Sequence, residues 1–220
     1  MHPPDTRSAR APGRLTWAIW GAVGAAILVP LLLAATSPFL ASRTPAYVVA
    51  GFAGILCLAL FLLQPLLAAG YLPGLRLRGS RWAHRLIGVG IVVSVLLHIG
   101  GLYLTSPPDT MDALLLVSPT PFSVYGVIAM WGVLVTALIV ALRHRLGLRY
   151  SLWRLVHNGL AAIVVVATVV HALQIDGTME PVSKWLLCIA VLAVNAAILL
   201  NLRVIKPLMS WFQQTGRSHS

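Results

Sequence analysis

Charged residues are scarce in this sequence, and acidic residues are the scarcest. Only 10% of the 220 residues are charged, and five of these are Asp or Glu, against 16 Lys or Arg. Hydrophobic residues make up 59% of the chain, and the mean hydropathy is +0.88. Soluble globular domains carry more charge and fewer apolar residues. The composition therefore argues against an ordinary soluble protein and indicates one that lies within a membrane.

Cysteine is almost absent, and the motifs that depend on it are missing. The two cysteines, Cys57 and Cys188, lie in separate apolar runs, so we expect packed free thiols. There is no C-x-x-C-H sequence, which excludes covalent attachment of a c-type haem. A glycine-rich dinucleotide fingerprint after a strand is absent as well.

Long apolar runs are abundant, and six of them are each long enough to cross a bilayer, which takes about 20 helical residues. Proline and glycine clusters fall mostly between these runs. We therefore predict an all-α fold, a polytopic bundle of six transmembrane helices. The expected division is a basic N-terminal tail at 1–14, the membrane domain at 15–204 and a C-terminal tail at 205–220. The predicted spans are 15–36, 47–70, 82–104, 121–142, 152–173 and 181–202.

Basic residues cluster in alternate connections between the predicted spans. All but Arg43 and Lys184 lie before the first span, around the second and fourth connections, or after the sixth span. The positive-inside rule then puts both termini in the cytoplasm. We expect an integral protein of the bacterial plasma membrane, with the lipid bilayer as its surroundings. The net charge of +11 is explained by basic residues in the connections on one side of the membrane, so nucleic acid is not an expected partner.

The third and fifth predicted spans each carry two histidines at the same spacing, H-x13-H. His84 and His98 lie on the third span, and His157 and His171 on the fifth. Fourteen residues rise about 21 Å in a helix and leave both side chains on one face. Both spans run in the same direction, so the histidines are level in two pairs. His84 and His157 form the inner pair, near the cytoplasmic boundary, and His98 and His171 form the outer pair.

A histidine inside a membrane span is costly and suggests a function. Two neutral imidazoles that face each other can supply both axial ligands of a haem iron, so two levels predict two haems. Zinc needs one compact tetrahedral ligand set, which groups about 21 Å apart cannot form. A non-redox metal or proton transporter is the alternative of another class. Proton relays use acidic residues, however, and all five lie outside the predicted spans.

Other side chains near the histidines have expected roles of their own. Arg81, Arg85 and Arg154 lie within one turn of the inner pair and are candidates to bind anionic haem propionates, or to act as positive-inside anchors. Trp82 and Trp153 are expected in the interfacial belt, with stacking on haem as the alternative. The amide side chains of Asn158 and Asn195 are expected to make hydrogen bonds between helices. Four glycines near the histidines of the third span are expected to admit either a neighbouring helix or a flat macrocycle: Gly88, Gly90, Gly100 and Gly101.

Two motifs accompany the histidine pairs: H-R-x-x-G at 84–88 and L-G-x-x-x-x-x-W-x-x-x-H at 146–157. With the six-span plan, they resemble the ferric reductase-like transmembrane domain that ferric-chelate reductases and NADPH oxidases share. The resemblance extends over roughly residues 58–202. It implies outward electron transfer through two b-type haems, one on the inner pair and one on the outer pair.

Full-length members of that family continue into FAD- and NAD(P)H-binding domains, for which this sequence has no fingerprint. We therefore expect the haem-bearing membrane subunit of an oxidoreductase, with a separate flavoprotein carrying FAD or FMN, or a membrane quinol, as electron donor. The expected external acceptor is a ferric chelate, oxygen or a periplasmic protein. The haem subunit of a periplasmic methionine sulfoxide reductase system and a quinone-linked cytochrome b are alternatives. The former group lacks the first histidine, so the presence of His84 favours the two-haem pattern.

Overall fold

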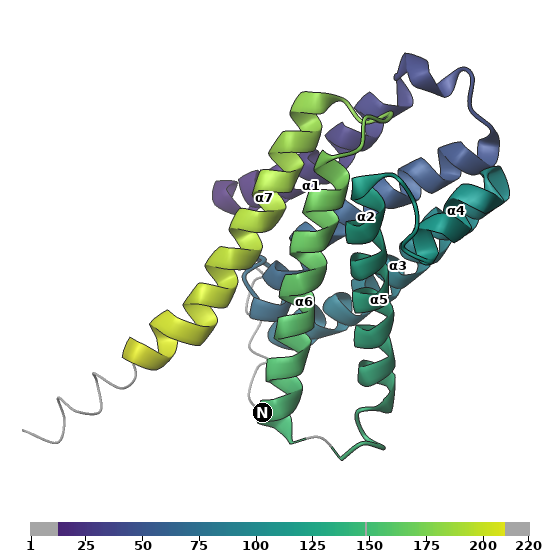
Figure 1. Cartoon of the computed structure of the whole chain (residues 1–220). Coiled ribbons are helices and arrows are strands. Elements are labelled where there is room, and N and C mark those ends of the chain that lie inside the picture. The colour runs from purple at the N-terminus through teal and green to yellow at the C-terminus, as the bar shows by residue number, and fades with distance from the viewer. Residues whose placement is uncertain (1–12, 148, 210–220) are drawn as a thin grey trace, which may run out of the picture.

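A computed structural model describes residues 13–147 and 149–209 of the chain. These residues form helices joined by short connections, and no strand occurs among them (Figure 1). Most of the tails expected at 1–14 and 205–220 lies outside the described residues. The elements are α1 (Arg14–Ala35), η1 (Pro38–Leu40), α2 (Pro45–Ala69), α3 (Leu77–Thr105), α4 (Pro107–Leu114), α5 (Pro121–Leu142), α6 (Tyr150–Leu173), α7 (Pro181–Leu200) and η2 (Asn201–Ile205).

Six helices are long and apolar enough to cross a membrane, which confirms the predicted six-span helical fold. Each coincides with a predicted apolar run, and the largest shift at either end is seven residues, where the last helix continues to Met209 through the π turn of η2. The short helix α4 was not predicted. Its first turn is closed by the Ser106 hydroxyl, which donates to the Asp109 carboxylate at 2.6 Å.

Two antiparallel hairpins, α2–α3 and α5–α6, form the main part of the bundle (Figure 1). Glycine permits the close crossing of helices within each hairpin, because it has no Cβ to hold the backbones apart. A Cβ added to Gly101 on α3 would lie 2.6 Å from the Ala46 carbonyl oxygen on α2. On the second hairpin, a Cβ at Gly132 would collide with the Val164 side chain. Helix α7 packs on α2 and α6 and so joins the two hairpins.

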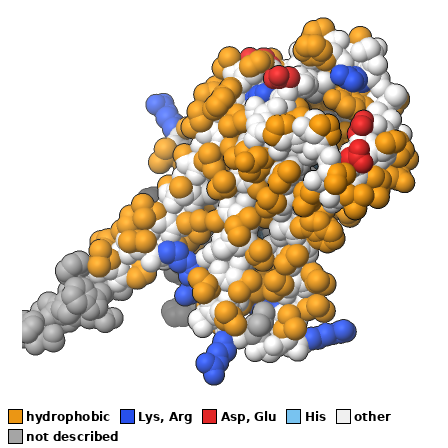
Figure 2. Space-filling view, viewed as in Figure 1, with side chains coloured by type: hydrophobic (Ala, Val, Ile, Leu, Met, Phe, Trp, Pro, Cys, Tyr) orange, Lys and Arg blue, Asp and Glu red, His pale blue; other side chains and the backbone are white. Residues whose placement is uncertain are grey.

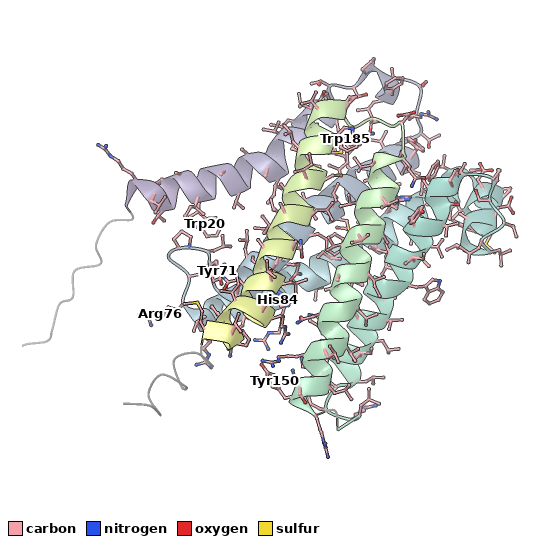
Figure 3. All side chains as sticks on the ribbon, turned by 60° about the vertical axis from the view of Figure 1, so that its left-hand side comes forward. Trp20, Tyr71, Arg76, His84, Tyr150 and Trp185 are labelled. Atoms are coloured by element: carbon pink, nitrogen blue, oxygen red, sulfur yellow. The ribbon has the colours of Figure 1, made fainter. Side chains whose placement is uncertain are left out.

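The two ends of the bundle differ in charge. Lys and Arg side chains project at the lower end in Figure 2, where no acidic side chain is visible, whereas the visible acidic side chains gather at the upper end together with other Lys and Arg side chains. Arg76 and Tyr150, at the starts of α3 and α6, mark the lower end in Figure 3, and Trp185 on α7 lies at the other. We call the end that holds the α2–α3 and α5–α6 connections the basic end, and the opposite one the far end.

The first and last helices are tied to the α2–α3 connection. The Trp20 indole of α1 donates to the Pro73 carbonyl oxygen at 3.1 Å, and the Asn201 amide donates to the Tyr71 hydroxyl at 2.9 Å. The start of α1 leans away from the other helices (Figure 3). These contacts tie Trp20 on α1 and the end of α7 to the connection between α2 and α3.

Helix α2 is the centre of the bundle, since half of its most apolar stretch is buried, against 11–28% in the other five. Pro65 lacks an N–H group and leaves the Phe61 carbonyl, one turn earlier, without its helical donor. The Asn195 amide of α7 donates to that oxygen at 3.2 Å, which confirms the expected hydrogen bond between helices. Cys57 and Cys188 are both buried free thiols, as expected.

Replacement of Asn195 should test this contact. Asn195→Leu leaves the Phe61 carbonyl without a donor in an apolar interior, and we expect a loss of about 1–2 kcal/mol in the free energy of unfolding. Pro65→Ala restores the helical N–H donor, so the same substitution should cost roughly half as much or less in that background. Thermal unfolding in detergent, followed by tryptophan fluorescence, measures both losses. Equal losses in the two backgrounds would contradict the assignment.

Candidate functional site

The four histidines of the predicted spans meet as two pairs between α3 and α6. The ring centroids of His84 and His157 are 6.2 Å apart, and those of His98 and His171 are 6.3 Å apart. The ring planes cross at 75° in the inner pair and at 86° in the outer pair. All four side chains are half-buried. The structure thus brings together the histidines that their spacing predicted to be level.

The two helices that carry the histidines belong to different hairpins. Helix α3 packs mainly on α2, and α6 mainly on α5, whereas close backbone approaches between α3 and α6 are few. The imidazole rings therefore meet between the two hairpins rather than within a close helix crossing. A group bound by both helices would lie between the paired rings.

Three of the four imidazoles are oriented by a hydrogen bond within their own hairpin. In each, Nδ1 lies within bonding distance of a backbone carbonyl oxygen, which can only accept, so Nδ1 carries the proton and Nε2 is free to act as a ligand. The same arrangement fixes the tautomer of histidines that bind metals. The bonds run from His98 to Ala50 (2.8 Å), from His171 to Phe122 (2.8 Å) and from His84 to Gln64 (3.2 Å).

Glycine makes room for the outer pair of rings. A Cβ added to Gly54 on α2 would lie 3.0 Å from His98 Nδ1, and one added to Gly126 on α5 would lie 2.7 Å from His171 Cε1. Each glycine lies one helical turn after the carbonyl that accepts the hydrogen bond. Without a side chain at these positions, the imidazole lies directly over the backbone and reaches that carbonyl.

Gly54 and Gly126 were not predicted, because the expected glycines lie on the third span. Of these, Gly100 has nothing within 4 Å of an added Cβ, whereas Gly101 contacts the backbone of α2. The carbonyl groups that accept these hydrogen bonds were not predicted, because every residue has a carbonyl and none is marked in the sequence. The two glycines could have been found from their spacing, since Gly126 follows Gly54 by 72 residues and each α6 histidine follows its α3 partner by 73. The two hairpins therefore repeat one arrangement.

The inner pair differs from the outer pair in its hydrogen bonding. His157 Nδ1 is buried and has no hydrogen-bond partner. The Trp153 indole stacks on the His157 ring instead, with centroids 4.9 Å apart and planes 28° from parallel. On the other side, the Gln64 amide donates to the His84 carbonyl oxygen at 3.3 Å, while its own Oε1 is buried without a partner. The inner level thus holds two buried polar atoms that no protein group satisfies.

The arginines expected near the inner pair all lie at the basic end. Arg81, Arg85 and Arg154 are exposed, and the Arg154 guanidinium lies over the Tyr150 ring, 5.1 Å from its centroid. None of the three has an acidic partner among the described residues. A different arginine reaches the inner level. With the Asn158 amide oriented so that its oxygen faces Arg203, the guanidinium donates to that oxygen, which is the kind of bond between helices expected of Asn158.

Trp82 and Trp153 have the same expected role from the sequence, but their surroundings differ in the structure. Trp153 contacts His157, whereas Trp82 is 60% exposed on α3. The spacing explains the difference, because residues four apart share a helix face and residues two apart do not. Trp153 precedes His157 by four residues, and Trp82 precedes His84 by two.

The donor set fits a haem iron. Metal–nitrogen bonds of about 2 Å on both sides of an iron place two imidazole centroids roughly 6 Å apart, which is the separation found in both pairs. Within residues 13–147 and 149–209, no group of three or more His, Cys, Asp or Glu comes together in a metal-binding arrangement. Two donors satisfy the axial positions of a haem, whereas a tetrahedral zinc site takes more.

Six long apolar helices and two pairs of facing histidines define an integral membrane protein with two candidate ligand pairs in its bundle. The family model for the ferric reductase like transmembrane component matches residues 50–168. The match covers more than half of the chain, and the protein belongs to this family. Membership indicates electron transfer across a membrane. No curated protein and no solved structure matches the chain.

The contact between Gly126 and His171 can be tested by Gly→Ala substitution, because the sign of the stability change depends on the space around the glycine. In a membrane helix with free space around it, Gly→Ala is expected to be neutral or stabilising, by up to about 1 kcal/mol. Gly100→Ala should behave so. Gly126→Ala should instead push the His171 ring away from the Phe122 carbonyl and destabilise the protein by about 1–3 kcal/mol. Melting temperatures in detergent measure both changes, and a rise in both variants would contradict the described geometry.

Proposed function

We propose that this protein carries electrons across the membrane through two b-type haems, one between the inner pair and one between the outer pair. The observation that supports this most strongly is the separation of the ring centroids, 6.2 and 6.3 Å, which suits bis-imidazole iron at both levels. Haem supplies reversible one-electron chemistry at its iron. No acid, base or nucleophile is needed for such a transfer, and the protein contributes binding, burial and charge.

The proposed task of the hairpins is to hold each ring so that Nε2 is available to iron. A hydrogen bond from Nδ1 to a carbonyl orients the imidazole and increases its basicity as a ligand. The two outer histidines both make this bond at 2.8 Å. The packing of each hairpin then fixes the distance between the carbonyl and the ring, and α7 holds the hairpins together.

The proposed partners of the inner haem propionates are Arg81, Arg85 and Arg154. All three lie at the basic end, near the inner pair, and lack acidic partners among the described residues. Guanidinium groups bind carboxylates with two parallel hydrogen bonds, so they suit propionates better than a point charge would. The same residues would also anchor the helices at the membrane surface.

In this proposal the basic end faces the cytoplasm of a bacterial cell, because the positive-inside rule requires it. Residues 15–204 form the membrane domain, between tails at 1–14 and 205–220. The protein is then the haem-bearing subunit of an oxidoreductase. Its donor is a flavoprotein with FAD or FMN, whose acidic surface would match the basic end, or a membrane quinol. Its acceptor lies outside, as a ferric chelate, oxygen or a periplasmic protein.

The geometry of the inner pair supports two haems over the alternative of a methionine sulfoxide reductase haem subunit, the group that lacks the first histidine. His84 is hydrogen-bonded to Gln64 and lies opposite His157, as a ligand would. A proton or metal transporter is disfavoured by the position of the carboxylates. Every acidic residue that the structure describes lies outside the six long helices: Asp109, Asp112, Asp176 and Glu180.

Single histidine variants test the ligand assignment. The purified protein should be red, with a sharp reduced-minus-oxidised b-type spectrum and two haems per chain. His98→Ala or His171→Ala should remove one haem, and His84→Ala or His157→Ala should remove the other. Haem quantification as the pyridine haemochrome measures the loss.

His144→Ala is the matched control, because His144 is exposed in the connection between α5 and α6. This variant should keep both haems. If all four single substitutions in the pairs also kept both haems, the ligand assignment would be wrong, and a colourless protein that binds a divalent metal would favour the transporter.

A further inference from the structure

The two hairpins repeat one arrangement but differ at one position beside the inner pair. Four residues before His84, α3 carries Ser80, and four residues before His157, α6 carries Trp153. Ser80 is fully buried, and its hydroxyl donates to the Leu67 carbonyl oxygen of α2 at 2.7 Å. This bond holds the start of α3 against α2, at the level where His84 reaches its own acceptor on α2.

The second hairpin has no equivalent acceptor for His157. On α2, the two acceptor carbonyls lie 14 residues apart, which is also the spacing of the two histidines on α3. The same spacing on α5, counted from the outer acceptor Phe122, leads to Thr136. The Thr136 hydroxyl donates within its own helix to the Gly132 carbonyl oxygen at 2.6 Å. His157 Nδ1 makes no hydrogen bond there or elsewhere in the described structure.

A ring stack occupies the place of the missing bond. The indole of Trp153 lies almost parallel to the His157 imidazole at 4.9 Å, and the Arg143 guanidinium lies over the Trp153 ring at 5.6 Å from its centroid. The contact with Arg143 restrains the indole, because a cation is attracted to the face of an indole ring. The indole in turn restrains the plane of the imidazole.

We propose that Trp153 is the positioning residue of His157 and that its stack replaces the Nδ1–carbonyl bond that orients the other three histidines. This inference rests on the proposed function in so far as it takes His157 to be an axial ligand. A stack orients the ring but does not increase its basicity as a hydrogen bond to Nδ1 does. His157 is then the most weakly held of the four ligands, and Trp153 is what keeps it on the iron.

Carbon monoxide binding measures how firmly His157 is held, because carbon monoxide binds ferrous haem only where an axial ligand has left. Reduced wild-type protein, with both haems bis-ligated, should react slowly. Trp153→Leu should speed carbon monoxide binding at one haem by about 10- to 100-fold, or remove that haem. Trp153→Phe keeps an aromatic ring against His157 and should react like the wild type. Trp82→Leu is the matched control, since Trp82 is an exposed tryptophan two residues before His84 and makes no ring contact to a histidine among the described residues.

Two further backgrounds identify the haem that responds. In His98→Ala, which keeps only the inner haem, Trp153→Leu should make the remaining haem reactive or remove it. In His84→Ala, which keeps only the outer haem, the same substitution should change nothing. An unchanged rate in Trp153→Leu would overturn the proposal. It would also be overturned by a Phe variant as reactive as the Leu variant, or by equal effects on the outer haem or in Trp82→Leu.

The outcomes separate this inference from the proposed function. A wild-type protein without haem would end both. A red wild type with two haems, of which neither responds to Trp153→Leu, would retain the proposed function and end only the role of Trp153.

Discussion

The hydrogen bond from imidazole Nδ1 to a helix carbonyl is the interaction on which the site depends. A helical carbonyl already accepts one N–H donor, and its second lone pair is free for another. The ring can use it only by lying directly over the neighbouring backbone, and Gly54 and Gly126 have no side chain to prevent this. The bond leaves Nε2 as the free nitrogen. In the proposed function, the close packing of each hairpin therefore leaves a nitrogen available to iron and does more than join two helices.

The outer level is symmetric and the inner level is not. His98 and His171 have the same bond length to their carbonyls and the same kind of glycine beside them. At the inner level, His84 has a longer bond, and His157 is held by the stack on Trp153. Because ligand basicity and burial tune a haem iron, two sites with identical ligands can differ in chemistry. In the proposed function, one repeated hairpin would then serve two distinct steps of electron transfer.

Sequence alone predicted the six helices and the level of the four histidines, since both follow from helical periodicity and from the alternating direction of spans. It did not predict the carbonyl acceptors or the role of Gly54 and Gly126. Those depend on the register between neighbouring helices, which side-chain packing decides and composition does not record. The contact of Trp153 was within reach of the sequence, because its spacing of four residues from His157 places both on one face, whereas Trp82 lies two residues from His84.

The central claim is that each histidine pair forms the two axial ligands of one haem. Electron paramagnetic resonance of the oxidised protein at low temperature tests it most directly. Bis-imidazole ferric haems whose ring planes are nearly perpendicular give highly anisotropic low-spin signals, and the planes here cross at 75° and 86°. We predict two such signals, of equal intensity. High-spin ferric signals, or the ordinary rhombic signals of parallel imidazoles, would contradict the account.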